Sequence, residues 1–514
     1  MRGTTGKATG RAKFSRRRSA PSGAGVGVLL RVWPTVLLTI LLAALALPAG
    51  MLIAPALTGQ TPTSAAPVQT PAWQLSPKEL SVPQGIDPLS TSAPIPLPAQ
   101  VAAKLDPVLK PDGGGTFTGV VQDAVTGTVL FDRNGTASRI PASNLKLLTA
   151  AAALKALGPE TRFSTKAVAG PAPGAASGAA GTNSRTVVLV GGGDVLLTAG
   201  ESAKDKVLGH GGLATLAKLT VESLRKDGFR GRVDVLVDDS LFSGPPLNPA
   251  WSPDDVAAGE VAPLFPLALN SARFDPAVTT GPRPQDSALA AGEAFAAQLT
   301  AAGAAAGLQV APAVGRLEGK AAPDAAVLGE VESATVSRQV DHMLQTSGNY
   351  LAEALGRMAA AATGQPASNE GAAAAVLQQL AGLGVPTDGM TVADVSGLAL
   401  ANQVSARQFS EVVRAIAAGQ DARLRAALAG FPVAGLTGTL GDRYVNASSA
   451  EGAGLVRAKT GTLNTVIALS GYVVDADGRL LVFSFIGNGL TPGAAGNKLA
   501  LDASATVLAA CGCR

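Results

Sequence analysis

A long apolar segment near the N-terminus restricts the topology of this chain more than any other feature. Residues 32–57 carry no charged side chain, and at ~1.5 Å per residue such a helix crosses a hydrocarbon layer ~30 Å thick. Eight Lys and Arg residues lie before it, and the first acidic residue of the chain is Glu79. Because basic flanks stay cytoplasmic, we expect a cytoplasmic tail over residues 1–31, a transmembrane anchor or signal segment over 32–57, and a body on the outer side of the membrane.

Two neighbouring features concern how this body is attached. Ala44 and Ala46 form an A-x-A pattern of the kind that signal peptidase cleaves, so a secreted product stays open beside a single-pass membrane protein. Residues 58–98 are rich in Pro, Ser and Thr, which predicts an extended linker. Such a linker would let a tethered body work some distance from the bilayer.

Charge and composition exclude some classes of partner. Of 41 basic residues, eight belong to the N-terminal tail, so the remaining 33 face 37 acidic ones. This balance gives no support for a nucleic-acid surface. The chain has two histidines and two cysteines, and the two kinds lie far apart, so we expect no metal and no cofactor. Cys511 and Cys513 form a local disulfide, pair with another molecule, or are an incidental terminal pair.

Apolar patterns predict a mixed α/β (α+β) body. Residues 116–122 and 128–131 read as one hairpin, and residues 463–474 and 479–487 as another, with Asp and Gly in the connecting turn. An Ala/Leu-rich run up to Leu157 is apolar on nearly every side, which predicts a helix at the centre of a domain, and residues 489–510 read as a further helix. Residues 166–325 differ in texture and predict one or two inserted domains.

Ser143 and Lys146 form an S-x-x-K pattern where the central helix is expected to begin. Residues three apart on a helix lie on one face. An amine kept neutral by desolvation can take the proton of a serine hydroxyl, and a helix N-terminus favours a developing oxyanion. Alone, the pattern also fits an ordinary helix start with a serine cap.

Ser347 and Asn349 form an S-x-N pattern in a second helix-start context. The hydroxyl suits a proton relay and the amide suits a substrate peptide, although an N-cap cluster has the same appearance. Residues 459–462 read K-T-G-T at the start of an apolar strand. A Lys, a Thr and an unencumbered Gly on an edge strand suit a substrate that ends in a carboxylate, and the alternative is a polar turn.

The S-x-x-K, S-x-N and K-T-G-T patterns follow one another along the chain, the first two at helix starts and the third at the start of a strand. Together they resemble the signature set of penicillin-binding proteins and β-lactamases. Ser143 and Ser347 are 204 positions apart, which resembles the D-Ala-D-Ala carboxypeptidase/endopeptidases, the class C low-molecular-mass penicillin-binding proteins, where inserted domains fill this interval. Segments 189–194, 394–398 and 432–440 are also similar to that family, and the resemblance spans about residues 99–510. Gly348 departs from the usual S-D-N pattern.

The resemblance implies an architecture. We expect a β-lactamase/transpeptidase-like catalytic domain over residues 99–165 and 326–514, in which an antiparallel sheet is flanked by helices and joined to a helical subdomain. Residues 166–325 would be inserted into it. Residues 459–462 would lie on the edge strand, and the groove between sheet and helical subdomain would hold Ser143.

The resemblance also implies a reaction on peptidoglycan stem peptides. The penultimate D-Ala carbonyl would acylate Ser143 and the terminal D-Ala would leave, with Lys146 as the general base and Ser347 passing a proton to the leaving amine. The implied substrate-binding residues are Asn349, Lys459, Thr460, Gly461 and Thr462. Backbone N–H groups of Ser143 and Thr462 would form the oxyanion hole. β-Lactams would acylate the same serine.

Three alternatives remain. A Ser-His-Asp hydrolase has only His210 and His342 to draw on, and no G-x-S-x-G pattern is present. A β-lactamase shares the three patterns. A catalytically silent wall-binding or scaffolding module is the alternative from another class, and acylation of Ser143 separates it from the enzymes.

Overall fold

The computed structural model describes residue 89, residues 92–171 and residues 183–514. They lie within one unit, Pro88–Arg514. The predicted tail, the apolar segment 32–57 and most of the linker 58–98 fall outside the described residues. Across the described part of the chain, no helix is both long enough and apolar enough to cross a membrane.

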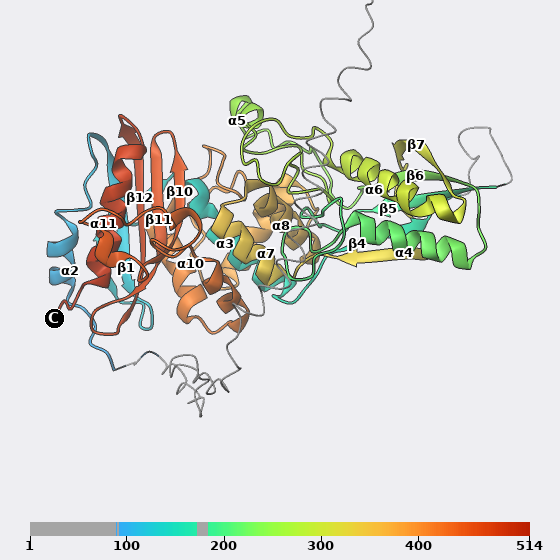
Figure 1. Cartoon of the computed structure of the whole chain (residues 1–514). Helices are drawn as coiled ribbons and strands as arrows, with labels where there is room; N and C mark the ends of the chain where they lie inside the picture. Colours follow the sequence, from blue (N-terminus) through green and yellow to red (C-terminus); the bar gives the residue numbers. More distant parts are fainter. Residues whose placement is uncertain (1–88, 90–91, 172–182) are drawn as a thin grey trace, which may run out of the picture. The chain divides into compact units, whose positions relative to one another are not determined.

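The first sheet has five antiparallel strands in the order β10-β11-β12-β1-β2 (Figure 1). Its strands are β1 (Gly114–Asp123), β2 (Val129–Arg133), β10 (Arg457–Leu463), β11 (Val466–Val474) and β12 (Leu480–Thr491). Both hairpins predicted from the sequence are confirmed. Strand β10, which carries residues 459–462, lies at the edge, as expected.

Alternate residues of β12 face two different hydrophobic cores, as the two-residue period of a strand requires. Val482 and Ile486 belong to the core that includes helix α10 (Ala406–Ala418). Phe483 and Phe485 belong to the core formed with α2 (Pro98–Leu105) and α11 (Lys498–Ala509). The helix predicted over 489–510 was too long at its start, because β12 continues to Thr491, which pairs with Gly114, and α11 begins only at Lys498.

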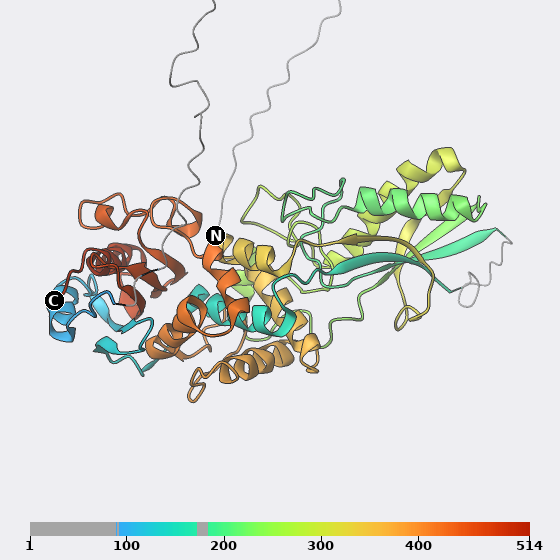
Figure 2. The same ribbon diagram turned by 90° about the horizontal axis from the view of Figure 1, so that it is seen from below.

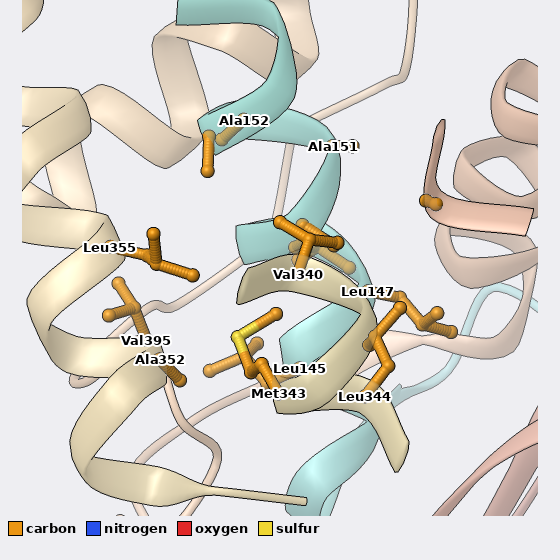
Figure 3. Packing of buried hydrophobic residues seen from close by; sticks show 14 of the residues in the cluster. Leu145, Leu147, Ala151, Ala152, Val340, Met343, Leu344, Ala352, Leu355 and Val395 are labelled. Atoms are coloured by element: carbon orange, nitrogen blue, oxygen red, sulfur yellow. The ribbon is translucent and has the colours of Figure 1, made fainter. Parts of the chain in front are cut away.

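Helix α3 (Lys146–Leu157) is the centre of a helical layer beside this sheet. Every residue from Lys146 to Leu154 is buried, which confirms the predicted central helix. Figure 3 shows its apolar side chains packed against Met343 and Leu344 of α7 and against Leu355 of α8. The helices around it are α7 (Val336–Thr346), α8 (Asn349–Ala362), α9 (Asn369–Ala381), α10 and the 3₁₀ segment η4 (Ala422–Gly430). Burying each leucine here contributes ~1.5–3 kcal/mol, so the layer holds α3 firmly.

A second five-stranded sheet has the order β7-β6-β5-β4-β8. Its residues lie between the S-x-x-K pattern at Ser143 and the S-x-N pattern at Ser347. Its strands are β4 (Ser164–Ala169), β5 (Ser184–Val190), β6 (Arg232–Asp238), β7 (Gln309–Arg316) and β8 (Val327–Glu332). Strands β5, β6 and β7 are parallel and are connected by α4 (Leu213–Lys226) and α6 (Ser287–Gly303). Figure 2 shows these two helices, in green and yellow, on one face of the sheet.

The remaining elements are short. They are β3 (Ser138–Arg139) paired with β9 (Val404–Ser405), α5 (Pro253–Ala258), and the 3₁₀ segments η2 (Ala142–Leu145), η3 (Ala304–Ala306), η5 (Gly438–Leu440), η6 (Ala450–Gly452) and η7 (Ala495–Asn497). Cys511 and Cys513 are joined by a disulfide and are buried. Of the arrangements considered for this pair, the structure has the local one.

Candidate active site

Ser143 lies on the 3₁₀ turn η2, which leads directly into α3. The preceding Ala142 has φ 48°, a conformation that costs a non-glycine residue energy and is retained where the surroundings hold it. Two glycines pack closely against the backbone of this turn. A Cβ on Gly397 would lie 2.0 Å from the carbonyl oxygen of Ala142, and one on Gly461 would lie 2.8 Å from that of Pro141. Any side chain at either position would displace the turn that presents Ser143.

Hydrogen bonds to the first sheet also hold this turn in place. Asn144 donates its side-chain amide to Ser470 Oγ at 2.7 Å, and Ser470 donates to Ser484 Oγ at 2.8 Å. Ser470 lies on β11 and Ser484 on β12. This buried chain of polar groups ties the serine turn to the central strands.

Lys146 is fully buried, and its Nζ has three oxygen neighbours. These are Ser143 Oγ at 2.9 Å, Asn349 Oδ1 at 2.7 Å and the carbonyl oxygen of Ser396 at 2.7 Å. Burial lowers the pKa of Lys146 to about 8, although the charges of Asp394, Glu353 and Glu260 oppose this change. An amine in this range is partly neutral near neutral pH and can accept a proton.

Ser347 and Asn349 flank the point where α7 ends and α8 begins. Ser347 caps the C-terminus of α7 in the left-handed conformation, with φ 56°, and Gly348 is the N-cap of α8. Asn349 accepts from Lys146 through Oδ1 and donates through Nδ2 to the carbonyl oxygen of Glu260 at 3.0 Å. The second bond fixes the orientation of its amide.

Lys459 forms a second buried pair of an amine and a hydroxyl. Its Nζ donates to Ser347 Oγ at 3.0 Å and to the carbonyl oxygen of Thr460 at 2.8 Å. Burial, and then the positive charge of Lys146, hold the pKa of Lys459 well below its usual value. The next side chain, Thr460, shares a hydroxyl hydrogen bond of 2.7 Å with Thr439.

These groups border a cavity of about 1120 Å³. Five of the eight predicted site residues line it, namely Ser143, Ser347, Asn349, Thr460 and Thr462. Lys146 and Lys459 lie behind this wall, fully buried. Gly461 also lies behind it, and the close approach that it permits is to the backbone of Pro141 rather than to the cavity.

Sequence reasoning missed several residues of the cavity wall. Glu260, Arg273 and Arg283 come from the middle region, and Thr439 comes from the 432–440 segment. Only Thr439 had a signal, because its segment resembled the family. The other three residues lie in irregular loops, whose sequences have no hydrophobic periodicity or motif from which a site could be predicted.

The histidines take no part in a serine–histidine pair with Ser143, whose hydroxyl is bonded to an amine. His210 is buried between the guanidinium of Arg162 at 2.8 Å and the carbonyl oxygen of Lys206 at 3.0 Å. His342 lines the cavity, and burial lowers its pKa.

A serine beside a buried lysine, together with a second hydroxyl–lysine pair formed by Ser347 after α7 and Lys459 on the edge strand, is the arrangement typical of active-site-serine enzymes with an S-x-x-K pattern. The model of the D-Ala-D-Ala carboxypeptidase 3 (S13) family matches residues 101–286 and 280–509, and the chain belongs to this family. It is a serine-type D-Ala-D-Ala carboxypeptidase. The resemblance drawn from the sequence patterns is thereby confirmed.

Two curated relatives cover most of the chain. Carboxypeptidase Rv3627c of Mycobacterium tuberculosis is 36% identical over 85% of this chain and 89% of its own length. Carboxypeptidase DacB of Mycolicibacterium smegmatis is 35% identical over 92% and 96%. Among solved structures, penicillin binding protein 4 (dacB) from Haemophilus influenzae covers 80% of this chain and 98% of its own, with TM-score 0.62 and 19% identity. This last likeness concerns the fold.

Proposed function

We propose that Ser143 is the nucleophile of this carboxypeptidase and Lys146 its general base. The observation that carries the proposal is the set of neighbours around Lys146 Nζ. A neutral amine has two N–H groups and one lone pair. The carbonyl oxygens of Asn349 and Ser396 accept hydrogen bonds only, so they take the two N–H groups. The lone pair is then left for the hydroxyl of Ser143, 2.9 Å away.

The acylation step follows from this arrangement. Ser143 Oγ attacks the carbonyl carbon of the penultimate D-Ala, and the hydroxyl proton passes to Lys146 Nζ. The C–N bond to the terminal D-Ala then breaks, Ser347 gives its hydroxyl proton to the leaving amine, and Lys459 Nζ, which donates to Ser347 Oγ, replaces that proton. Water completes the cycle by hydrolysing the ester.

The oxyanion would be held by the backbone N–H groups of Ser143 and Thr462, two residues that line the cavity. Losing one such donor typically costs ~2.7–4 kcal/mol of barrier. The terminal carboxylate of the substrate would meet the hydroxyls of Thr460 and Thr462. Because Lys459 lies behind them, its contribution would be a positive field and a hydrogen bond through Ser347.

We assign residues 99–165 and 326–514 to the catalytic domain and residues 166–325 to an insert. Strand β4 (Ser164–Ala169) spans the first of these boundaries and β8 (Val327–Glu332) begins two residues after the second, and the two strands pair with each other. The pairing supports an insert that begins and ends within a few residues of these boundaries. Residues 260–283 of the insert also contribute to the cavity wall. The body would act on stem peptides outside the cytoplasmic membrane, attached through residues 32–57 or released after cleavage.

Intact mass after incubation with benzylpenicillin tests this function. A soluble protein of residues 58–514 should gain one stable penicilloyl group, and the Ser143→Ala variant should gain none. The H. influenzae neighbour has been solved in complex with a β-lactam (TM-score 0.56, 19% identity), which makes this probe a reasonable choice. No adduct on folded protein would favour a silent wall-binding module, and rapid turnover of penicillin would indicate a β-lactamase.

Release of D-Ala separates the two hydrolytic activities. A stem peptide ending in D-Ala-D-Ala should lose one D-Ala, and a cross-linked dimer should be split only by an endopeptidase. Both should depend on Ser143. Activity toward either substrate in the Ser143→Ala variant would contradict the proposed nucleophile.

A further inference from the structure

Segment 394–399 supplies one of the two carbonyl oxygens that orient Lys146, and its own shape depends on Asp394. This carboxylate is buried and accepts hydrogen bonds from three successive backbone N–H groups, those of Gly397 (2.8 Å), Leu398 (3.0 Å) and Ala399 (2.8 Å). A carboxylate that closes a turn around itself in this way fixes the direction of each carbonyl group in the turn.

Side chains from other parts of the fold hold Asp394 in place. Trp251 donates its indole N–H to Oδ2 at 2.9 Å, and Asn402 donates its amide to Oδ1 at 2.7 Å. The hydroxyl of Ser396 also donates to Oδ2, at 3.2 Å. Because so many hydrogen bonds are made to its charged oxygens, the carboxylate of Asp394 has little freedom to move.

Glu353 holds the same segment from α8. Its Oε1 accepts from the backbone N–H of Val395 at 3.1 Å, while the carbonyl oxygen of Val395 accepts from Thr149 on α3 at 2.5 Å. Segment 394–399 is thus bonded on one side to the helix that carries Lys146 and on the other to the helix that carries Asn349.

We propose that Asp394 and Glu353 are positioning residues, which act through the carbonyl oxygen of Ser396 to aim the lone pair of Lys146 at Ser143. The inference rests on the proposed roles of Ser143 and Lys146. It assigns a function to two carboxyl groups that touch neither the cavity nor the substrate. Without the Ser396 acceptor, the amine would rotate and its lone pair would no longer be directed at the hydroxyl.

The same two groups affect the pH range of the reaction. Three charged groups act on Lys146, namely Asp394, Glu353 and Glu260, and each raises its pKa. Its buried neighbour Lys459 has a pKa that burial and the charge of Lys146 lower. Burial, and then the charge of Asp394, raise the pKa of Glu353 to about 8, and nearby Arg357 acts in the opposite direction. Replacing Asp394 by asparagine removes a charge that favours protonated Lys146, so acylation should reach its plateau at lower pH. With its pKa at about 8, Glu353 carries little charge at pH 7, so replacing it by glutamine should have a smaller effect.

Three variants test the proposal by acylation with benzylpenicillin between pH 6 and 9. Asp394→Asn should lower the plateau rate at least tenfold and move the midpoint of the pH profile downward. Glu353→Gln keeps an acceptor for Val395 and replaces a carboxyl group that is largely protonated below pH 8, so the plateau should stay within about threefold and the midpoint should move downward by less than in Asp394→Asn. Trp251→Phe removes one bond to Asp394 from a residue outside the cavity lining and should lower the plateau without moving the midpoint.

Asp475→Asn is the matched control. Asp475 is also buried and also closes a turn, accepting from the N–H groups of Asp477 and Arg479 at 3.0 and 2.8 Å, but in the hairpin between β11 and β12. It should lower the melting temperature without changing the pH profile. Should Asp394→Asn fail to fold, Glu353→Gln and Trp251→Phe carry the test.

The outcomes separate this inference from the proposed function. If the wild-type protein is not acylated, the proposed role of Ser143 as nucleophile is refuted. Wild-type acylation together with folded variants whose plateau and midpoint match the wild type overturns the positioning role alone. A shifted profile in Asp475→Asn would also overturn it, because the effect would then be a general consequence of losing a buried turn.

Discussion

Replacing Asn349 by aspartate should test the protonation state of Lys146 directly. The substitution preserves the size of the side chain but puts a carboxylate oxygen where Oδ1 now accepts from Nζ at 2.7 Å. An opposite charge within ~4–6 Å raises the pKa of an amine by about 1–3, which corresponds to about 1.4–4 kcal/mol in favour of the protonated form. With the wild-type pKa of Lys146 at about 8, roughly one-tenth of the amine is neutral at pH 7.

The expected result is a loss that pH can reverse. At pH 7 the neutral fraction, and with it the rate of acylation by benzylpenicillin, should fall by ~10- to 1000-fold. As the pH rises to 10, the gap between Asn349→Asp and the wild type, which levels off above about pH 8, should narrow to ~10-fold or less. Acylation is followed by intact mass after rapid acid quenching, from pH 6 to 10.

Asn446→Asp provides the control, since this exposed residue lies outside the residues that line the cavity. It should behave as wild type at every pH. An equal loss in Asn349→Asp at all pH values would refute the reasoning, because the amide would then serve only to bind the ligand.

Further predictions concern other parts of the fold. Thr439→Val removes the hydroxyl bonded to Thr460, and at ~0.5–1.5 kcal/mol per hydrogen bond kcat/KM for D-Ala release should fall about 2- to 13-fold; an unchanged value would exclude a role in the site. Gly348→Asp should leave acylation intact and stabilise the protein by a few tenths of a kcal/mol in urea unfolding, because a Cβ there meets only ordinary contacts at 3.4 and 3.8 Å; loss of acylation would show that the glycine is needed. Burial raises the pKa of Asp194 to about 7, so the folded state retains a proton that the unfolded chain has lost, and stability should fall as the pH rises from about 4 to 7. Asp194→Asn should reduce this slope when unfolding is compared at pH 5 and pH 8, and an undiminished slope would assign it to other groups.

Contacts between residues close in the sequence could be predicted, whereas contacts between residues far apart in the sequence could not be predicted from local patterns. The contact between Ser143 and Lys146 follows from a spacing of one helical turn, and the hairpins follow from strand periodicity and turn residues. Bringing Ser347 and residues 459–462 to the same place required the family resemblance, since no local pattern reports contacts across hundreds of residues.

The parts that escaped prediction are settled by tertiary packing. Lys459 was expected to present its charge to a carboxylate, yet its Nζ lies behind Thr460 and is bonded to Ser347. Gly461 was expected to admit a ligand, and it instead admits the backbone of Pro141. Glu260 reaches the site from an irregular loop, whose course depends on the rest of the fold rather than on its own sequence.

The burial of Lys146 and Lys459 side by side has a consequence for ligand screening. Two desolvated amines that lower each other's affinity for protons oppose folding in the free enzyme, so an anionic ligand near Lys459 should relieve part of that cost. That relief contributes to the affinity itself, so a compound carrying a carboxylate should raise the melting temperature more than its neutral analogue at the same concentration. A thermal-shift screen at pH 7 would favour acidic inhibitors of this enzyme, including those that never form a covalent bond.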